Sequence, residues 1–304
     1  MFNLQQTIAR LQQKNDKAFY LALLRVLVSL WFIKEMLFRW PAFEVLYSNH
    51  SFLKLESTYS LQLFGLNASL LKEHYMILIA VCMGLLLLNL FGIGRNIVSL
   101  LLFLSFTVLY HLDNRFANSG DEMSMLLLFY LSFANTFSHF VLFKRKPFSP
   151  QKEKLYNLLS NLAAYSIMIN LCLSYFMAGT FKLMDPYWKN GTGIYYFVND
   201  DRYSVFAAGA KHVDFPWVLS YIISYGTILL ELSFPFLVWH KKYRNIIFII
   251  SLLMHLGIYS FLMIYGMTLI FIIQYGLFYT NEEVMAVAEK IKLFFRKLFR
   301  FTLK

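Results

Sequence analysis

The chain has 304 residues, of which 59% are hydrophobic and 15% are charged, and its mean hydropathy is +0.54. This composition excludes an ordinary soluble globular domain, in which about a quarter of the residues are charged. The formal net charge is +11, but the basic residues lie in short clusters between apolar runs. Such clusters are typical of topology signals in membrane proteins and do not indicate nucleic-acid binding.

The apolar windows, taken in chain order, predict an all-α integral membrane protein with a bundle of roughly eight transmembrane helices, since one span requires about 20 mostly apolar residues. The windows cover residues 18–38, 74–93, 97–112, 123–142, 157–178, 217–239, 246–263 and 265–280. The last two windows are short and meet at Ile264 to Gly266, so a tight hairpin and one broken helix both remain open. No small-residue cleavage motif follows the first window, which is therefore expected to remain as a span.

The distribution of lysine and arginine predicts the orientation. With residues 1–17 in the cytoplasm, most basic residues fall on the inner side of the cell membrane, and both termini are predicted to be cytoplasmic. A single transmembrane domain is expected over 18–280, with the long loops 39–73, 113–122 and 179–216 outside. The tail, 281–304, places apolar residues opposite a basic face, which predicts an amphipathic helix on the anionic inner leaflet: Ile291, Phe294, Phe295 and Leu298.

One stretch, "YFMAGTFKLMDPYWKNGTGIYYF" at residues 175–197, begins as the end of a membrane helix and then breaks. Lys182 follows a pair of small residues, and Asp185-Pro186 is expected to end the helix. Trp188 suits the headgroup boundary, and Gly191 permits a turn. The stretch therefore predicts an interfacial break that holds one amine close to the membrane surface, although a lysine at such a position more often merely extends to the headgroups.

These residues resemble a known signature. The spacings are those of the vitamin K-dependent gamma-carboxylase-like membrane domain, the HTTM family, at Tyr175-Phe176, Ala178-Gly179, Lys182-Leu183, Trp188, Gly191 and Tyr195. Further features resemble the same family and extend the similarity over about residues 18–280: the turn from Asn118 to Glu122, Glu231 in "ELSFPF" and His255 in "LLMHLGIYSF". The chain looks like a compact, bacterial-type member.

The resemblance implies a multi-helix membrane domain whose site opens to the outer side, where a lysine acts as base on reduced vitamin K. Lys182 occupies the matching position, so a reduced quinone is the cofactor that the resemblance suggests, without fixing it. The carboxylase has a histidine at the start of the helix that corresponds to 123–142, whereas this chain has Asp121 and Glu122, with His111 about one helix end away. Two acids beside Lys182 would keep it charged and make it a binding cation rather than a base. The carboxylase's large lumenal domain has no counterpart here, so full gamma-carboxylation is not expected.

The candidate catalytic residues are Lys182, Glu231 and His255, and the candidate substrate-binding residues are Asp121, Glu122, Trp188, Tyr195 and His111. A carboxylate at mid-membrane depth costs about 2.5 kcal/mol or more, so Glu231 is expected to have a partner or to be protonated, and His255 is a candidate partner. A purely structural hydrogen bond between helices would also explain both residues, and a helix cap would explain the two acids. No metal site is expected, since both cysteines lie in apolar runs without a CxxC motif.

Three functions remain open. The first is an enzyme that performs base-assisted, carboxylase- or lyase-like chemistry on a quinone-like lipid or a secreted peptide. The second is a non-enzymatic maturation, escort or immunity factor for an exported peptide, similar to the sporulation-delaying peptide maturation members of the family. The third is a small-molecule transporter. The expected partners are the lipid bilayer and a secreted peptide or other membrane proteins, and nucleotide hydrolysis has no motif to support it.

Overall fold

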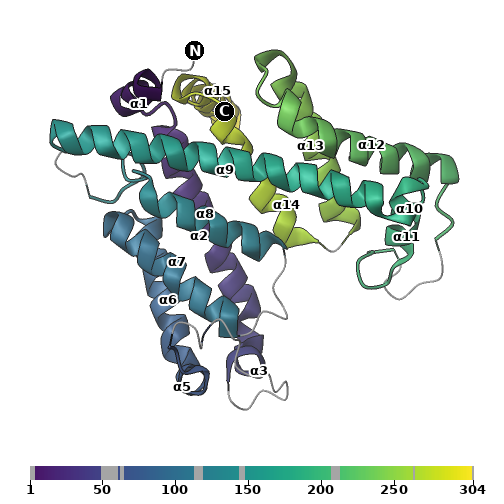
Figure 1. Ribbon diagram of the computed structural model, residues 1–304, viewed down its shortest axis with the longest axis horizontal. Coiled ribbons are helices and arrows are strands. Elements are labelled where there is room, and N and C mark those ends of the chain that lie inside the picture. The colour runs from purple at the N-terminus through teal and green to yellow at the C-terminus, as the bar shows by residue number, and fades with distance from the viewer. Residues whose placement is uncertain are drawn as a thin grey trace. The chain divides into compact units, whose positions relative to one another are not determined.

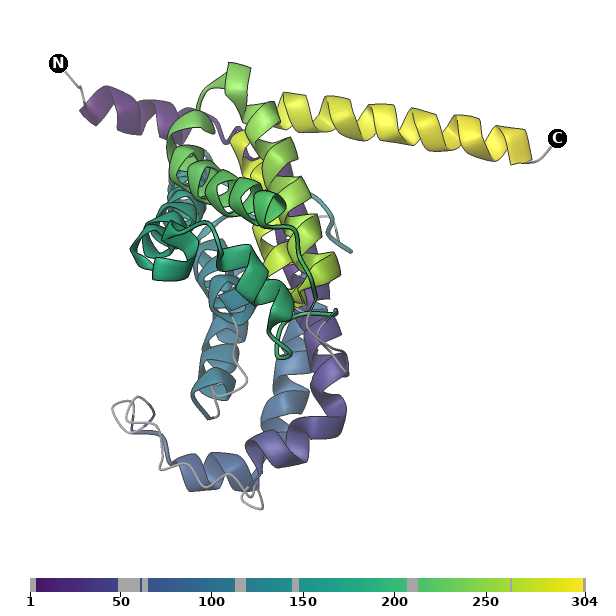
Figure 2. The same ribbon diagram turned by 90° about the vertical axis from the view of Figure 1, so that its right-hand side faces the viewer.

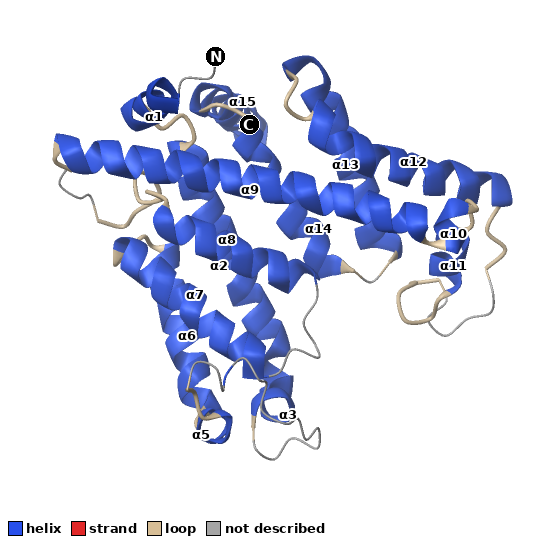
Figure 3. Cartoon of the chain, in the orientation of Figure 1, coloured by secondary structure: helices blue, strands red, loops and turns tan. Residues whose placement is uncertain are grey.

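The computed structural model describes residues 4–48, 61, 65–112, 119–143, 148–206, 213–262 and 264–302. Within these ranges the elements are helices joined by loops, and the β-structure is one isolated antiparallel bridge between Ser204 and Leu262 (Figures 1 and 3). The all-α class is thereby confirmed. Asn118, which begins the turn quoted above, lies outside the described residues.

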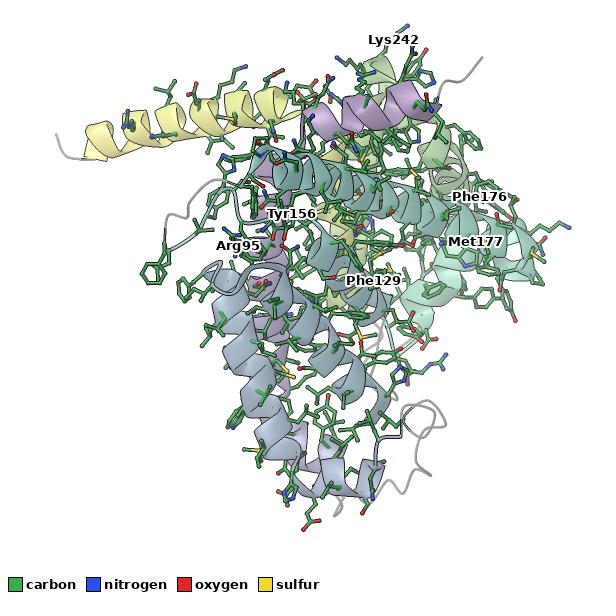
Figure 4. The ribbon with its side chains drawn as sticks, turned by 60° about the vertical axis from the view of Figure 1, so that its left-hand side comes forward. Arg95, Phe129, Tyr156, Phe176, Met177 and Lys242 are labelled. Carbon is green, nitrogen blue, oxygen red and sulfur yellow. The ribbon has the colours of Figure 1, made fainter. Side chains whose placement is uncertain are left out.

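Four helices of the described part are long and apolar enough to cross a membrane: α7 (Arg95–Leu112), α9 (Pro150–Met184), α12 (Trp217–Leu237) and α13 (Lys241–Phe261). Two shorter apolar segments lie at α6 (Tyr75–Leu90) and at Tyr265–Phe278. The protein is therefore a helical protein compatible with membrane insertion, and the bundle of eight spans stays a prediction. Large apolar side chains are exposed on the helices, among them Phe176 and Met177 of α9 and Phe129 in the segment 119–133 (Figure 4). Lipid would cover such surfaces at no cost in buried polar groups.

The remaining predicted windows correspond to α2 (Ala18–Arg39) and α8 (Ser119–Phe133). The helix α8 ends well before the predicted boundary at residue 142 because its last turn is capped from a neighbouring helix. The Asn96 side chain at the start of α7 donates hydrogen bonds to the carbonyl oxygens of Ser132 and Ala134, at 2.7 and 2.9 Å. These carbonyl oxygens therefore do not need N–H donors from a further helical turn, and the chain leaves the helix.

By its internal contacts the chain divides into two compact units. Unit 1 comprises Met1–Ala117, Glu122–Tyr165 and Tyr279–Lys304. It contains α2, α6 and α7, of which α6 packs against the other two. The smaller helices of unit 1 are α1 (Leu4–Gln13), η1 (Trp40–Ala42), α3 (Phe43–Tyr47) and α5 (Ala68–Glu73), and its last helix is α15 (Asn281–Thr302).

Arg25 forms the polar core of unit 1. It is fully buried within α2, and the recorded acceptors of its guanidinium are backbone carbonyl oxygens at the end of α6 and in the segment after α8: Asn89, Leu90, Thr136, His139 and Phe140. The C-terminus of a helix carries partial negative charge, so the end of α6 compensates part of the buried cation. Arg25 therefore ties three segments of unit 1 together.

Unit 2 comprises Asn118–Asp121 and Ser166–Phe278. It contains the second half of α9 and the helices α10 (Pro186–Lys189), α11 (Gly193–Asn199), α12 and α13, followed by α14 (Tyr265–Ile272) and η2 (Tyr275–Phe278). The helix α13 ends at Phe261 and α14 begins at Tyr265, so the last two windows form two helices rather than one. The bridge between Ser204 and Leu262 joins this break to the segment after α11.

Candidate functional site

The candidate site begins where α9 ends. Asp185 accepts hydrogen bonds through Oδ1 from the backbone N–H groups of Tyr187 and Trp188, at 2.9 and 3.1 Å, and so caps α10. Pro186 follows at the first helical position, where its missing N–H is not needed. This carboxylate is therefore engaged in a helix cap, which explains why Asp185-Pro186 stands directly after an apolar helix.

The two glycines of the break are required by geometry. Gly191 has φ +75°, in the left-handed region that favours glycine, and a Cβ there would lie 2.0 Å from Cδ1 of Tyr221. At Gly193 a Cβ would lie 2.5 Å from Cδ2 of Trp188. The chain thus turns closely around the Trp188 indole, which is itself buried beside Lys182.

Lys182 forms an ion pair with Glu231. Its Nζ lies 2.8 Å from Oε1 of Glu231, and the two side chains are 23% and 7% exposed. The ammonium also lies 5.1 Å from the ring centroid of Trp188, within range of a cation–π interaction. The partner of Glu231 is therefore Lys182, whereas the sequence had suggested His255.

Two features of the backbone place this pair. Gly179 lets α9 and α12 approach closely, since a Cβ at that position would lie 2.9 Å from Cγ of Leu232 and 3.1 Å from Cβ of Glu231. Pro235 lies inside α12 and has no N–H to donate to the carbonyl oxygen one turn earlier, which belongs to Glu231. The helix is consequently weakened at the turn that carries the carboxylate.

A second polar cluster lies on the same side of α9, two turns before Lys182. The Tyr175 hydroxyl is hydrogen-bonded to Nε2 of His255 at 2.7 Å and to the Tyr275 hydroxyl. The Tyr175 ring stacks on Phe234 at a centroid distance of 3.9 Å. His255 therefore holds a tyrosine that packs α9 against α12 one turn from Glu231.

Among the buried polar atoms at these clusters that have no hydrogen-bond partner in the described structure are Oε2 of Glu231 and Nδ1 of His255. Buried polar groups are almost always paired, so such atoms call for an explanation. Oε2 of Glu231 can accept a hydrogen bond from a hydroxyl group that approaches Lys182. Within the described ranges, no three histidine, cysteine or acidic side chains cluster to hold a metal ion.

The other predicted binding residues lie in different surroundings. Tyr195 in α11 stacks on Trp217 at a centroid distance of 4.4 Å. Glu122 accepts a hydrogen bond from Tyr110 in unit 1, and His111 makes an edge contact with the same tyrosine ring. Asp121 is buried near the start of α8. The structure thus brings together Lys182, Glu231 and Trp188, and it places His255 in the adjoining tyrosine cluster.

Sequence reasoning missed two tyrosines of the second cluster as site residues. Tyr175 could have been found, because it precedes Lys182 by two helical turns and therefore lies on the same face. Tyr275 carries no such signal, since it lies in a separate segment that only the fold brings to α9.

Comparison with family models, curated proteins and solved structures finds no match to this chain. The functional interpretation therefore depends on the geometry of the site and on the resemblance described above.

Proposed function

We propose that this protein is a multi-pass membrane enzyme that performs base-assisted chemistry at the outer face of the cell membrane, with Lys182 as the base and a quinol-like lipid as the substrate. The observation that carries the proposal is the contact between Lys182 and Glu231, which is largely withdrawn from solvent and leaves one carboxylate oxygen without a partner. Membership of the gamma-carboxylase-like family is part of the same proposal, and the position of Lys182 at the end of α9 supports it.

The resting ion pair explains how a lysine can become a base. A charged pair in a low-dielectric site is only marginally favourable, because both ions lose hydration. When a ligand displaces the remaining water, transfer of one proton from Nζ of Lys182 to Oε1 of Glu231 makes both groups neutral. The neutral amine then has a lone pair available.

The proposed step conserves protons and electrons. The lone pair of the Lys182 amine takes the proton of a substrate hydroxyl, and the electrons of the broken O–H bond remain on the substrate oxygen. Glu231 holds the proton that it received from lysine, so the net change is one proton moved from substrate to carboxylate. The substrate oxyanion stays beside the regenerated ammonium, which stabilises it.

The neighbouring side chains have positioning roles. The buried Trp188 ring lies beside the amine, and its cation–π contact helps to hold the ammonium in position. Tyr175 and His255 act through the packing of α9 on α12 and thereby fix the separation between Lys182 and Glu231. A donor hydroxyl on the ligand would satisfy the unpaired oxygen of Glu231.

The experiment uses the purified full chain in lipid nanodiscs with a reduced short-chain naphthoquinone as the probe. Binding is followed by quenching of tryptophan fluorescence, and ionisation of the bound hydroquinone by its near-ultraviolet absorbance. We expect the unmodified protein to bind and ionise the probe. Lys182→Met should abolish ionisation, and Lys182→Arg should retain binding but lose ionisation, because an arginine in a protein keeps its proton.

Lys189→Met is the matched control, since Lys189 is an exposed lysine at the end of α10 close in sequence to the site. This variant should behave like the unmodified protein. If Lys182→Arg ionises the probe as well as lysine does, or if Lys182→Met leaves ionisation unchanged, Lys182 is not the base. Absence of binding by the unmodified protein would reject a quinol as the substrate.

A further inference from the structure

The two ends of the chain are joined in unit 1. The backbone N–H of Asn281 donates to the carbonyl oxygen of Asp16 at 2.8 Å, and the Asn281 side chain accepts from the N–H of Phe19 at 3.0 Å. Lys17 donates to the carbonyl oxygen of Tyr279 at 2.7 Å. The start of α15 is thus fixed to the start of α2.

Charged side chains add to this junction. Nζ of Lys14 lies 2.7 Å from Asp16 and 3.3 Å from Glu282. Hydrogen bonds to Asp16 and then to Glu282 raise the pKa of the Lys14 ammonium. Asn161 in α9 donates hydrogen bonds to the carbonyl oxygens of Leu11 and Lys14. These bonds fix the end of α1 next to the junction.

The helices α1 and α15 leave this junction in opposite directions, across the axis of α2 (Figure 2). Both are amphipathic. On α1, Leu4, Ile8 and Leu11 recur at helical spacing on one face. On α15, Val284, Val287 and Ile291 do the same. If α2 is the span that the sequence predicts at residues 18–38, helices that leave its end in this way would lie along the membrane surface.

The apolar face of α15 is not covered by the described chain. Val287 and Ile291 are both more than half exposed. Basic groups flank this face at Lys290 and Lys292, and Arg296 lies farther around the helix. The side chains of Phe294, Phe295 and Leu298, which the sequence also placed on the apolar face, lie outside the described part. An uncovered apolar stripe beside basic residues matches the interface of a bilayer with anionic headgroups.

We infer that α1 and α15 form one rigid interfacial frame, clamped at Asp16 and Asn281, that binds the anionic lipids of one membrane leaflet. The apolar stripes enter the boundary between headgroups and acyl chains, while the lysines and arginines contact the headgroups. The clamp fixes the direction of both helices before binding, so less conformational entropy is lost than with loose tails. This inference is independent of the proposed role of Lys182.

The test places an environment-sensitive NBD label on single cysteines of the full protein, at Ile291→Cys on the apolar face and at Glu289→Cys on the polar face. Both native cysteines are buried, and unsubstituted protein treated in the same way gives the background. Nanodiscs contain acyl-brominated phosphatidylcholine, with or without phosphatidylglycerol. With phosphatidylglycerol present, bromine should quench the label at 291 strongly and the label at 289 weakly.

A second variant separates lipid binding from simple apolar contact. Combining Lys290→Gln, Lys292→Gln and Arg296→Gln should remove most of the quenching at 291, as should omission of phosphatidylglycerol. Equal quenching at 289 and 291, or no quenching at either position in anionic nanodiscs, would overturn the frame. If strong quenching at 291 persists without anionic lipid and without the basic residues, the basic residues do not bind anionic headgroups.

Discussion

At the level of single residues, the buried guanidinium of Arg25 is the most demanding group in the molecule. It lies in a window that the sequence predicts as a span, and its acceptors are carbonyl oxygens contributed by two segments, the end of α6 and the segment after α8. A charge buried without partners would be very costly, so these hydrogen bonds allow the guanidinium to be buried in unit 1. The sequence shows the arginine, but it cannot show which carbonyl groups approach it.

Replacing Arg25 should therefore destabilise the protein. Arg25→Met leaves several buried carbonyl oxygens without donors, and we expect a loss of about 3 kcal/mol in the free energy of unfolding. Denaturant unfolding in mixed micelles measures it. Arg202→Met is the control, because Arg202 is an exposed residue whose recorded ion pair is with Asp200 close by in sequence, and should change stability by less than about 1 kcal/mol. Equal stability of the two variants would show that Arg25 is dispensable.

The sequence alone identified Lys182 and Glu231 as candidate site residues, because a lysine at a helix break and a carboxylate in mid-helix are both costly in a membrane. Their pairing was not predictable. It depends on the relative rotation of α9 and α12 and on the close approach at Gly179, neither of which one sequence reveals. The competing assignment of His255 to Glu231 was reasonable from membrane depth alone, but His255 contacts Tyr175.

At the level of elements, apolar windows located the helices but not their ends. The end of α8 depends on capping by Asn96, which is distant in sequence, so a hydropathy window extends too far. From the sequence, the segment around residue 264 could be either a tight hairpin or a break in one helix. In the structure α13 and α14 are separate helices, and Leu262 between them pairs with Ser204. Helix interiors follow local composition, whereas helix ends follow tertiary hydrogen bonds.

The packing of α9 on α12 provides the test at this scale. A Gly179→Ala substitution introduces a Cβ against Leu232 and Glu231, and should separate the two helices at a net cost of about 1–2 kcal/mol. The Lys182 amine should also react faster with acylating reagents as its partner moves away. Unfolding curves and peptide mass spectrometry measure the two effects.

Gly226→Ala is the matched control for this prediction. Gly226 lies in α12 and has open space around the position of a Cβ, so alanine there should stabilise the helix by up to about 1 kcal/mol. It should leave the reactivity of Lys182 unchanged. If both substitutions behave alike, close approach at Gly179 does not position the ion pair.

At the level of the whole molecule, composition predicted a membrane protein and the apolar windows predicted the all-α class, and the four long apolar helices agree with both. The excess of lysine and arginine on one side predicts that both termini are cytoplasmic and that the site at Lys182 faces the outside. Function is less accessible, because the site depends on contacts between helices that are far apart in sequence. The proposed role of Lys182 combines the resemblance at residues 175–197 with the ion pair to Glu231.

The most direct measurement is the accessibility of the Lys182 amine from each side of the membrane. A membrane-impermeant acylating reagent is applied to intact cells and to inside-out vesicles, and modified lysines are identified by mass spectrometry. We expect Lys182 to be modified from the outside, faster in Glu231→Gln because the ion pair is lost, while Lys290 and Lys292 react only in inside-out vesicles. Modification of Lys182 solely from the cytoplasmic side, or a rate unaffected by Glu231→Gln, would contradict an outward-facing proton-transfer pair.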